Sequence, residues 1–84
     1  MVKLSVMQVS VAKSKSGYGF AIVGVRPVTV SRVHPGGPAD RAGLREGDVI
    51  WRINRLNVWN STAESIARIV RLASAITILT IARL

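Results

Sequence analysis

The 84-residue sequence has no cysteine, one histidine and four acidic residues. Without thiols, the chain can form neither a disulfide framework nor a thiolate metal site, and a reducing, cytosolic setting is favoured. A single histidine does not make a transition-metal centre. Serine, histidine and aspartate occur, but no nucleophile motif joins them, and Asp48 is expected to order local backbone. We therefore expect no metal, no cofactor and no enzymatic activity.

The sequence also lacks long apolar runs. No stretch reaches the roughly 18 apolar residues that a membrane-spanning helix needs. Residues 1–11 alternate between apolar and polar side chains, whereas a signal peptide has a continuous apolar segment. Apolar residues nevertheless make up 49% of the chain, which is enough for one compact core at this length. We therefore expect one monomeric domain spanning residues 1–84.

Acidic charge is scarce, and twelve basic residues give the chain a formal net charge of +8. Such a charge favours anionic partners, namely nucleic acid, acidic lipid headgroups or acidic peptides. The basic residues are scattered and only 5% of the residues are aromatic, so we expect no nucleic-acid partner. A second interpretation stays open, in which the basic surface binds acidic lipid at the membrane periphery and Trp59 enters the interface. Trp59 is otherwise a partly packed surface aromatic.

The alternation of apolar residues predicts a chain made mostly of strands. In the first predicted strand, apolar residues recur at nearly every second position, at Leu4, Val6, Val9 and Val11. The pattern shifts by one position after Val6, which we interpret as a bulge near Met7–Gln8. Short runs rich in apolar and β-branched residues predict further strands at 20–25, 28–33, 48–53 and 76–82.

Two helices are expected between these strands. Pro38 suits the first turn of a helix and Gly43 suits a left-handed stop, which together predict a single helical turn over Ala39–Ala42. The spacing of apolar residues over 63–72 predicts a longer helix. Its N-cap is expected to be Thr62 or Ser61.

The tetrapeptide Gly17-Tyr18-Gly19-Phe20 is the most informative local motif, and it follows a polar loop at Lys13–Ser16. Two glycines let the backbone approach a ligand closely and adopt dihedrals closed to other residues. Successive amide groups in such a turn can form a nest for an anion, although a plain tight turn also accounts for the glycines. The motif is not a phosphate loop, because the Gly-Lys-Ser/Thr ending is missing.

With this tetrapeptide, three further features make the sequence resemble the PDZ domain family over nearly its whole length. The first is Lys13, a basic residue four positions before Gly17. The other two are spaced motifs that stand in the family's order: Gly36-Gly37-Pro38-Ala39 followed by Gly43-Leu44, and Gly47-Asp48-Val49-Ile50 followed by Ile53-Asn54.

The resemblance implies a small, mainly β fold, a partly open antiparallel barrel or sandwich capped by one short and one longer α-helix. It also implies a scaffold or adaptor module that binds the free C-terminus of a partner protein by β-augmentation between the second strand and the second helix. The loop for the ligand carboxylate would be formed by Lys13, Gly17, Tyr18, Gly19 and Phe20. The groove would be lined by Ala21, Ile22, Val23, Ala63, Ala67 and Val70. Ligand charges would be contacted by Arg32 and Arg71.

Ligand preference is expected to depend on Ala63, the first position of the longer helix. The commonest PDZ subclass has a histidine there, which bonds a Ser or Thr hydroxyl third from the ligand's end. Ala63 offers only a small apolar face, so we expect an apolar residue at that ligand position and an apolar last residue. Ile66 and Ile69 should face the core. The sequence leaves open whether Ala67 and Val70 line the groove or belong to the core. A third interpretation, a regulatory domain of a PDZ-bearing protease, would leave this chain itself inert.

Overall fold

The computed structural model describes residues 3–15, 17–73 and 76–84. Ser16, the last residue of the expected polar loop, lies outside these ranges. The secondary-structure elements along the chain are β1 (Ser5–Ala12), β2 (Phe20–Gly24), β3 (Val28–Val33), α1 (Pro38–Ala42), β4 (Val49–Ile53), β5 (Leu56–Asn57), α2 (Ala63–Leu72) and β6 (Ile76–Arg83).

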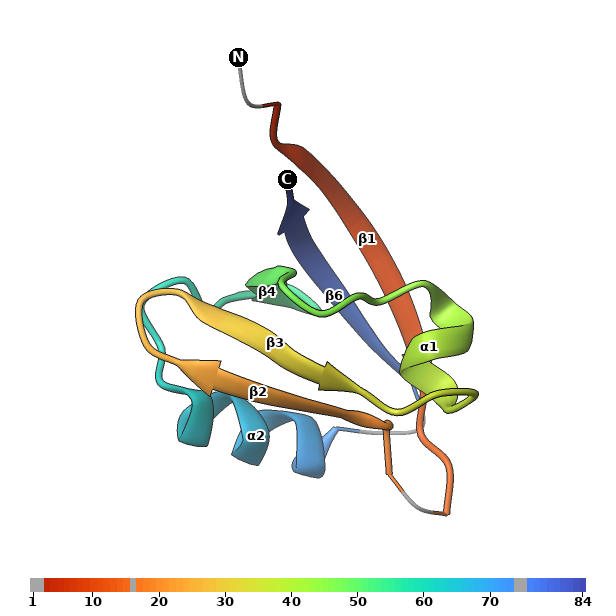
Figure 1. Ribbon diagram of the computed structural model, residues 1–84. Helices are drawn as coiled ribbons and strands as arrows, with labels where there is room; N and C mark the ends of the chain where they lie inside the picture. The colour runs from red at the N-terminus through yellow and green to blue at the C-terminus, as the bar shows by residue number, and fades with distance from the viewer. Residues whose placement is uncertain (1–2, 16, 74–75) are drawn as a thin grey trace.

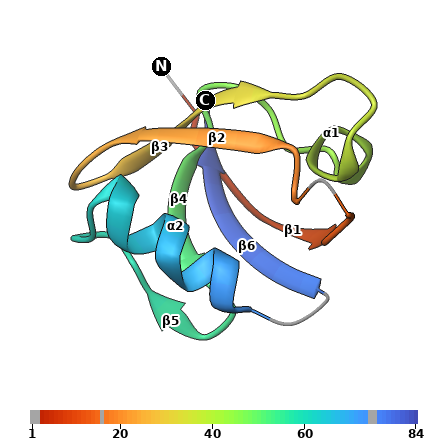
Figure 2. The ribbon, with the colours of Figure 1, turned by 90° about the horizontal axis from the view of Figure 1, so that it is seen from below.

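The described strands form one antiparallel sheet in the order β1-β6-β4-β3-β2, with the short β5 paired to β4. Strands β1 and β2 are therefore the two ends of the sheet. The sheet curves, α2 runs alongside β2, and α1 lies at the opposite side near β1 (Figures 1 and 2). The predicted class, a mainly β fold with one short and one longer helix, is confirmed.

The expected bulge near Met7–Gln8 is wrong. The ladder between β1 and β6 runs through the whole of β1 without a register shift. The phase of the apolar pattern changes because the strand's apolar face changes: Leu4 and Val6 are exposed, whereas Val9 and Val11 are buried in the core. Register shifts occur instead where β2 pairs with β3 and where β4 pairs with β6.

The helix ends follow the expected chemistry. Pro38 opens α1, and Gly43 ends it in a left-handed conformation with φ of 97°. Thr62 caps α2, because its hydroxyl oxygen accepts a hydrogen bond from the Ser65 amide at 3.1 Å. Of the two candidates for this cap, the structure therefore selects Thr62 over Ser61.

The core fills the space between the curved sheet and α2. Its fully buried apolar side chains include Val11, Val28, Ile50, Ile53, Ile66, Leu79 and Ile81. Burying such a side chain stabilises a fold by about 1.5–3 kcal/mol. On α2, Ile66 is fully buried and Ile69 packs partly buried against the core, as expected. Val70 is buried as well and also borders the groove described below.

Asp48 carries a buried carboxylate just before β4, with 1% of its surface exposed. Its Oδ2 accepts a hydrogen bond from the Arg45 amide at 2.9 Å, so it orders the local backbone as expected. Arg83 at the end of β6 donates to both carboxylate oxygens at 2.8 Å and to the Gly43 carbonyl at 2.8 Å. The hydrogen bonding of its guanidinium to the Asp48 carboxylate raises the pKa of Arg83. This pair ties β6 to the segment between α1 and β4.

Arg83→Gln should destabilise the fold, because it leaves the Asp48 carboxylate buried without its cation. Breaking a buried ion pair in this way costs about 3 kcal/mol, which urea unfolding would measure as a lower free energy of unfolding. Arg55→Gln is the matched control, since it removes the same charge from an exposed turn and should change stability by no more than about 0.5 kcal/mol. Equal losses in the two variants would contradict a structural role for the pair.

Candidate binding groove

A hollow of about 480 Å³ lies between β2 and α2. It is lined by Lys13, Gly17, Tyr18, Phe20, Ala21, Ile22, Ala63, Glu64, Ala67, Val70 and Arg71. Most of the residues that the sequence suggests for a ligand site are thus brought together here. Glu64 was not among them, and it lies in the first turn of α2 with its carboxylate 3.9 Å from the Arg68 guanidinium.

The groove follows the outer side of β2, the end strand of the sheet. β2 is paired with β3 on one side, and on the other side it faces α2 (Figure 2). In an antiparallel strand, alternate backbone groups point to each side, so an end strand presents N–H and C=O groups outward. Beyond the strand, a bridge between Val25 and Thr62 and a 3.4 Å bond from the Arg26 amide to the Ser61 carbonyl close the far end of the groove.

At the near end, hydrogen bonds fix which way the loop amides point. The Tyr18 carbonyl accepts a bond from the Ala39 amide at 3.0 Å, and the Gly19 carbonyl accepts one from the His34 amide at 2.8 Å. In a trans peptide, the C=O and the following N–H point in opposite directions. The N–H groups of Gly19 and Phe20 therefore point away from α1 and β3, toward the open side of the loop. This orientation suits an anion at the end of the groove.

The two glycines of the loop meet different demands. Both have positive φ, 97° at Gly17 and 80° at Gly19, a region that side chains other than glycine's rarely adopt. A Cβ added at Gly17 would meet nothing within 4 Å, whereas one added at Gly19 would lie 3.2 Å from Cδ of Pro38. Gly19 is thus also required by the close approach of α1, which the sequence alone does not reveal.

Tyr18 and Lys13 anchor the loop to two other elements. The Tyr18 side chain is buried, and its hydroxyl oxygen accepts a hydrogen bond from the Thr77 hydroxyl of β6 at 2.9 Å. The ammonium of Lys13 donates to the backbone carbonyl of Arg71 at 3.4 Å, at the end of α2. Lys13 and Arg71 both line the groove, so two cationic residues border it where the end of α2 meets the segment before the loop.

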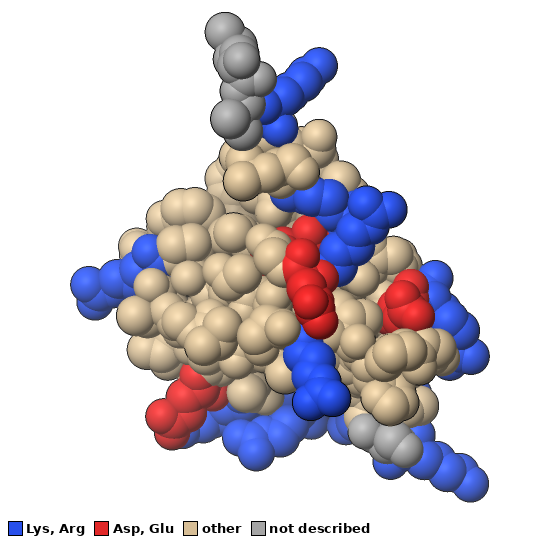
Figure 3. Space-filling model, in the orientation of Figure 1, with Lys and Arg blue, Asp and Glu red and all other residues tan. Residues whose placement is uncertain are grey.

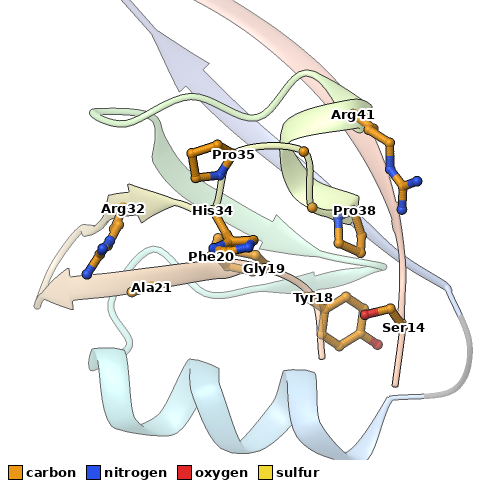
Figure 4. A pocket seen from close by; sticks show the side chains of 12 residues that line it. Ser14, Tyr18, Gly19, Phe20, Ala21, Arg32, His34, Pro35, Pro38 and Arg41 are labelled. Carbon is orange, nitrogen blue, oxygen red and sulfur yellow. The ribbon is translucent and has the colours of Figure 1, made fainter. Parts of the chain in front are cut away.

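Three of the predicted residues lie outside this hollow. Val23 is 55% exposed and lines neither the groove nor the hollow next to it. Gly19 and Arg32 border a second hollow of about 740 Å³, on the other face of β2 (Figure 4). Its lining is Ser14, Tyr18, Gly19, Phe20, Ala21, Arg32, His34, Pro35, Gly36, Gly37, Pro38 and Arg41. The pairing of Ala21 with Arg32 across β2 and β3 explains why Arg32 lies on that face.

Trp59 lines neither of these two hollows and lies against Trp51 of β4. The two rings meet edge to face with centroids 6.2 Å apart, and Trp59 remains 41% exposed. Both border a hollow of about 390 Å³ with the exposed Leu4. Basic side chains occur at several separate places on the face drawn in Figure 3, both at its rim and beside acidic side chains near its middle, as their scatter in the sequence predicts.

The described residues contain no cluster of three His, Asp or Glu side chains suited to a metal ion. In the same ranges, neither helix has the length and apolar character needed to cross a bilayer. What the described residues do present is a groove with the backbone of β2 along one wall and α2 along the other, where Ala63, Ala67 and Val70 are apolar and Glu64 and Arg71 are charged.

Comparison with known proteins gives matches over most of the chain. A family model described as PDZ domain matches residues 29–83. Regulator of G-protein signaling 12 of Mus musculus is 39% identical over 71 residues, which is 84% of this chain and 5% of that protein. Rho guanine nucleotide exchange factor 11 of Homo sapiens is 38% identical over 63 residues, which is 75% of this chain and 4% of that protein. The chain thus spans about a twentieth of the length of these curated relatives.

A solved structure agrees with the fold. The PDZ domain of choanoflagellate SHANK1, solved bound to a GIRK3 peptide, has a TM-score of 0.93 and 24% sequence identity. The match covers 99% of this chain and 97% of that one. Three findings agree: the family model matches residues 29–83, the two curated relatives are 38–39% identical, and a solved PDZ domain has the same fold. The chain therefore belongs to the PDZ domain family.

Proposed function

We propose that this domain binds the free C-terminus of a partner protein as an added strand between β2 and α2. One observation carries the proposal: the outward backbone groups of β2 face a groove lined by Tyr18 and Phe20, and between these residues the amides of Gly19 and Phe20 point to the open side of the loop. An extended ligand segment would pair with β2, and each main-chain hydrogen bond contributes about 1 kcal/mol net. The proposed role is a binding module in a scaffold or adaptor, with no catalytic step.

The ligand's terminal carboxylate would lie at the loop end of the groove. Amides of the loop point to that side, and Lys13 and Arg71 add positive charge beside it. Hydrogen bonds to an ionised acceptor are roughly twice as strong as neutral ones. A free C-terminus would therefore be preferred to an internal segment of the same sequence. The SHANK1 PDZ domain, which has the same fold, was solved bound to a peptide, and this supports peptide binding by the present chain.

The groove wall supports an apolar ligand. Phe20, Ile22 and Val70 line the part near the loop, where the last side chain of the ligand would lie. Ala63 and Ala67 line the helix side, one turn apart, and neither offers a hydrogen bond. A ligand hydroxyl placed against Ala63 would lose its water without gaining a partner. We therefore propose an apolar residue third from the ligand's end.

Binding to acidic membranes is the alternative function. It is favoured by Trp59 and Leu4, which are exposed side by side at one hollow, together with the net charge of +8. Attraction to acidic headgroups is screened by salt, whereas apolar burial in the groove is not.

The cysteine-free sequence supports a cytosolic setting for the domain. The names of the relatives suggest that the longer protein that carries it acts in signalling.

Amidation of a bound peptide should weaken its affinity by about 1.5–3 kcal/mol, because it removes the negative charge of the terminal carboxylate that the loop amides and Lys13 would stabilise. Calorimetric titration of a free-acid peptide and its amide would measure the difference. Equal affinity for the two peptides would rule out a carboxylate site. Absence of peptide binding, together with salt-sensitive binding to vesicles of acidic lipid, would instead favour the alternative function.

Ala63→His should shift the preference at the third ligand position from Val toward Thr by about 1 kcal/mol, because the imidazole can bond the hydroxyl. Paired titrations with Val and Thr peptides on both forms would measure it. Leu72→His is the control, since it adds the same group to the same helix at a residue 82% exposed and outside the groove. A wild-type domain that clearly prefers Thr would refute this assignment.

A further inference from the structure

The hollow on the other face of β2 has a different character from the groove. Its walls are the start of β2, the end of β3 and the 34–38 segment that leads into α1. Two arginines and the chain's only histidine line it, and none of its described lining residues is acidic. Asp40 lies nearby on α1, where its carboxylate accepts a 2.7 Å bond from the Gly36 amide. In Figure 4, Arg32 lies beside Ala21, His34 lies between them and the loop, and Arg41 is at the far end.

The register of the sheet explains which side chains face this hollow. Phe20 and Ile22 pack against the core and line the groove, while Ala21 between them is exposed. Successive side chains of a strand point to opposite faces, so Ala21 points away from the core. Arg32 is paired directly with Ala21 on β3, and side chains opposite each other in a ladder lie on the same face. Ala21 itself borders both hollows.

A ligand strand paired with β2 would present its side chains to both faces in turn. If the last residue places its carboxylate at the Gly19 and Phe20 amides and its side chain in the groove, the penultimate residue lies alongside Ala21. Its side chain then leaves the groove and passes over the methyl group of Ala21. Because Ala21 is small and exposed, this path to Arg32 is open.

We propose that this hollow receives an acidic side chain, aspartate or glutamate, from the penultimate residue of the ligand, with Arg32 as its main partner. The inference rests on the proposed function and names the ligand class for the same binding mode. A guanidinium fits a carboxylate with two parallel hydrogen bonds, and His34 borders the same space. Arg32 is exposed, so the pair should favour the acidic peptide by a modest factor, about two- to fivefold in affinity.

The test uses free-acid peptides that are identical except for Glu, Gln or Lys at the penultimate position. Their affinities would be measured at low and high salt for the wild-type chain, Arg32→Gln and Arg55→Gln. Arg55→Gln is the control because it lowers the net charge by the same amount as Arg32→Gln. Arg55 is also exposed, but it lies outside the hollow. We expect the wild type and Arg55→Gln to bind Glu above Gln by about two- to fivefold, and Arg32→Gln to bind them equally.

Each other outcome overturns the inference in a distinguishable way. Equal affinity of the wild type for Glu and Gln peptides would exclude the acidic subsite, while a free acid that still outbinds its amide would leave the proposed function standing. Equal loss of preference in Arg32→Gln and Arg55→Gln would assign the effect to the overall charge. Failure of every peptide to bind would overturn the proposed function and this inference with it. Thermal unfolding would verify that both variants fold.

Discussion

The backbone N–H and C=O groups on the outer side of an end strand need hydrogen-bond partners other than a neighbouring strand. In this chain the end strand β2 presents those groups to a groove. Water bonds such groups in the free protein, but a row of them is also a template for another extended chain. Helix α2 lies alongside without covering the strand, and the contacts at Val25 and Thr62 hold it there at one end. The small side chains of Ala63 and Ala67 keep the space open. The outer edge of β2 is thus available for pairing, and α2 leaves room beside it for one extended segment.

The loop at the start of β2 is held from several sides before any ligand arrives. Its carbonyls bond the amides of Ala39 and His34, Tyr18 is tied to β6 through Thr77, and Gly19 lies against Pro38. Binding of the proposed ligand would then need little ordering of the loop, which lowers the entropy lost on association. The same loop also separates two hollows of different character. The groove is mainly apolar, and the hollow across β2 is lined by cations, so one ligand strand would meet two environments in alternation.

Local patterns in the sequence predicted the elements whose causes are local. The apolar spacing over 63–72 and the left-handed Gly43 gave correct helix limits because helix periodicity and caps depend on near neighbours. The groove residues depended on the family resemblance, since composition alone does not bring β2 and α2 together. The tie between Asp48 and Arg83 was missed because the two are 35 residues apart, and no local signal marks such a pair. The cationic hollow also needed the β2–β3 register, which appears only once the strands are paired.

Amide hydrogen exchange, followed by NMR with and without a free C-terminal peptide, tests most directly where the ligand lies. Strand addition at β2 predicts that the peptide slows exchange at the Gly19 and Phe20 amides and along β2. The amides of β2 should be slowed more than those of β1, the other end strand of the sheet, because stabilisation of the whole fold by the peptide slows both strands alike. Slowed exchange along β1 or around Trp59, with β2 unchanged, would contradict binding at the groove.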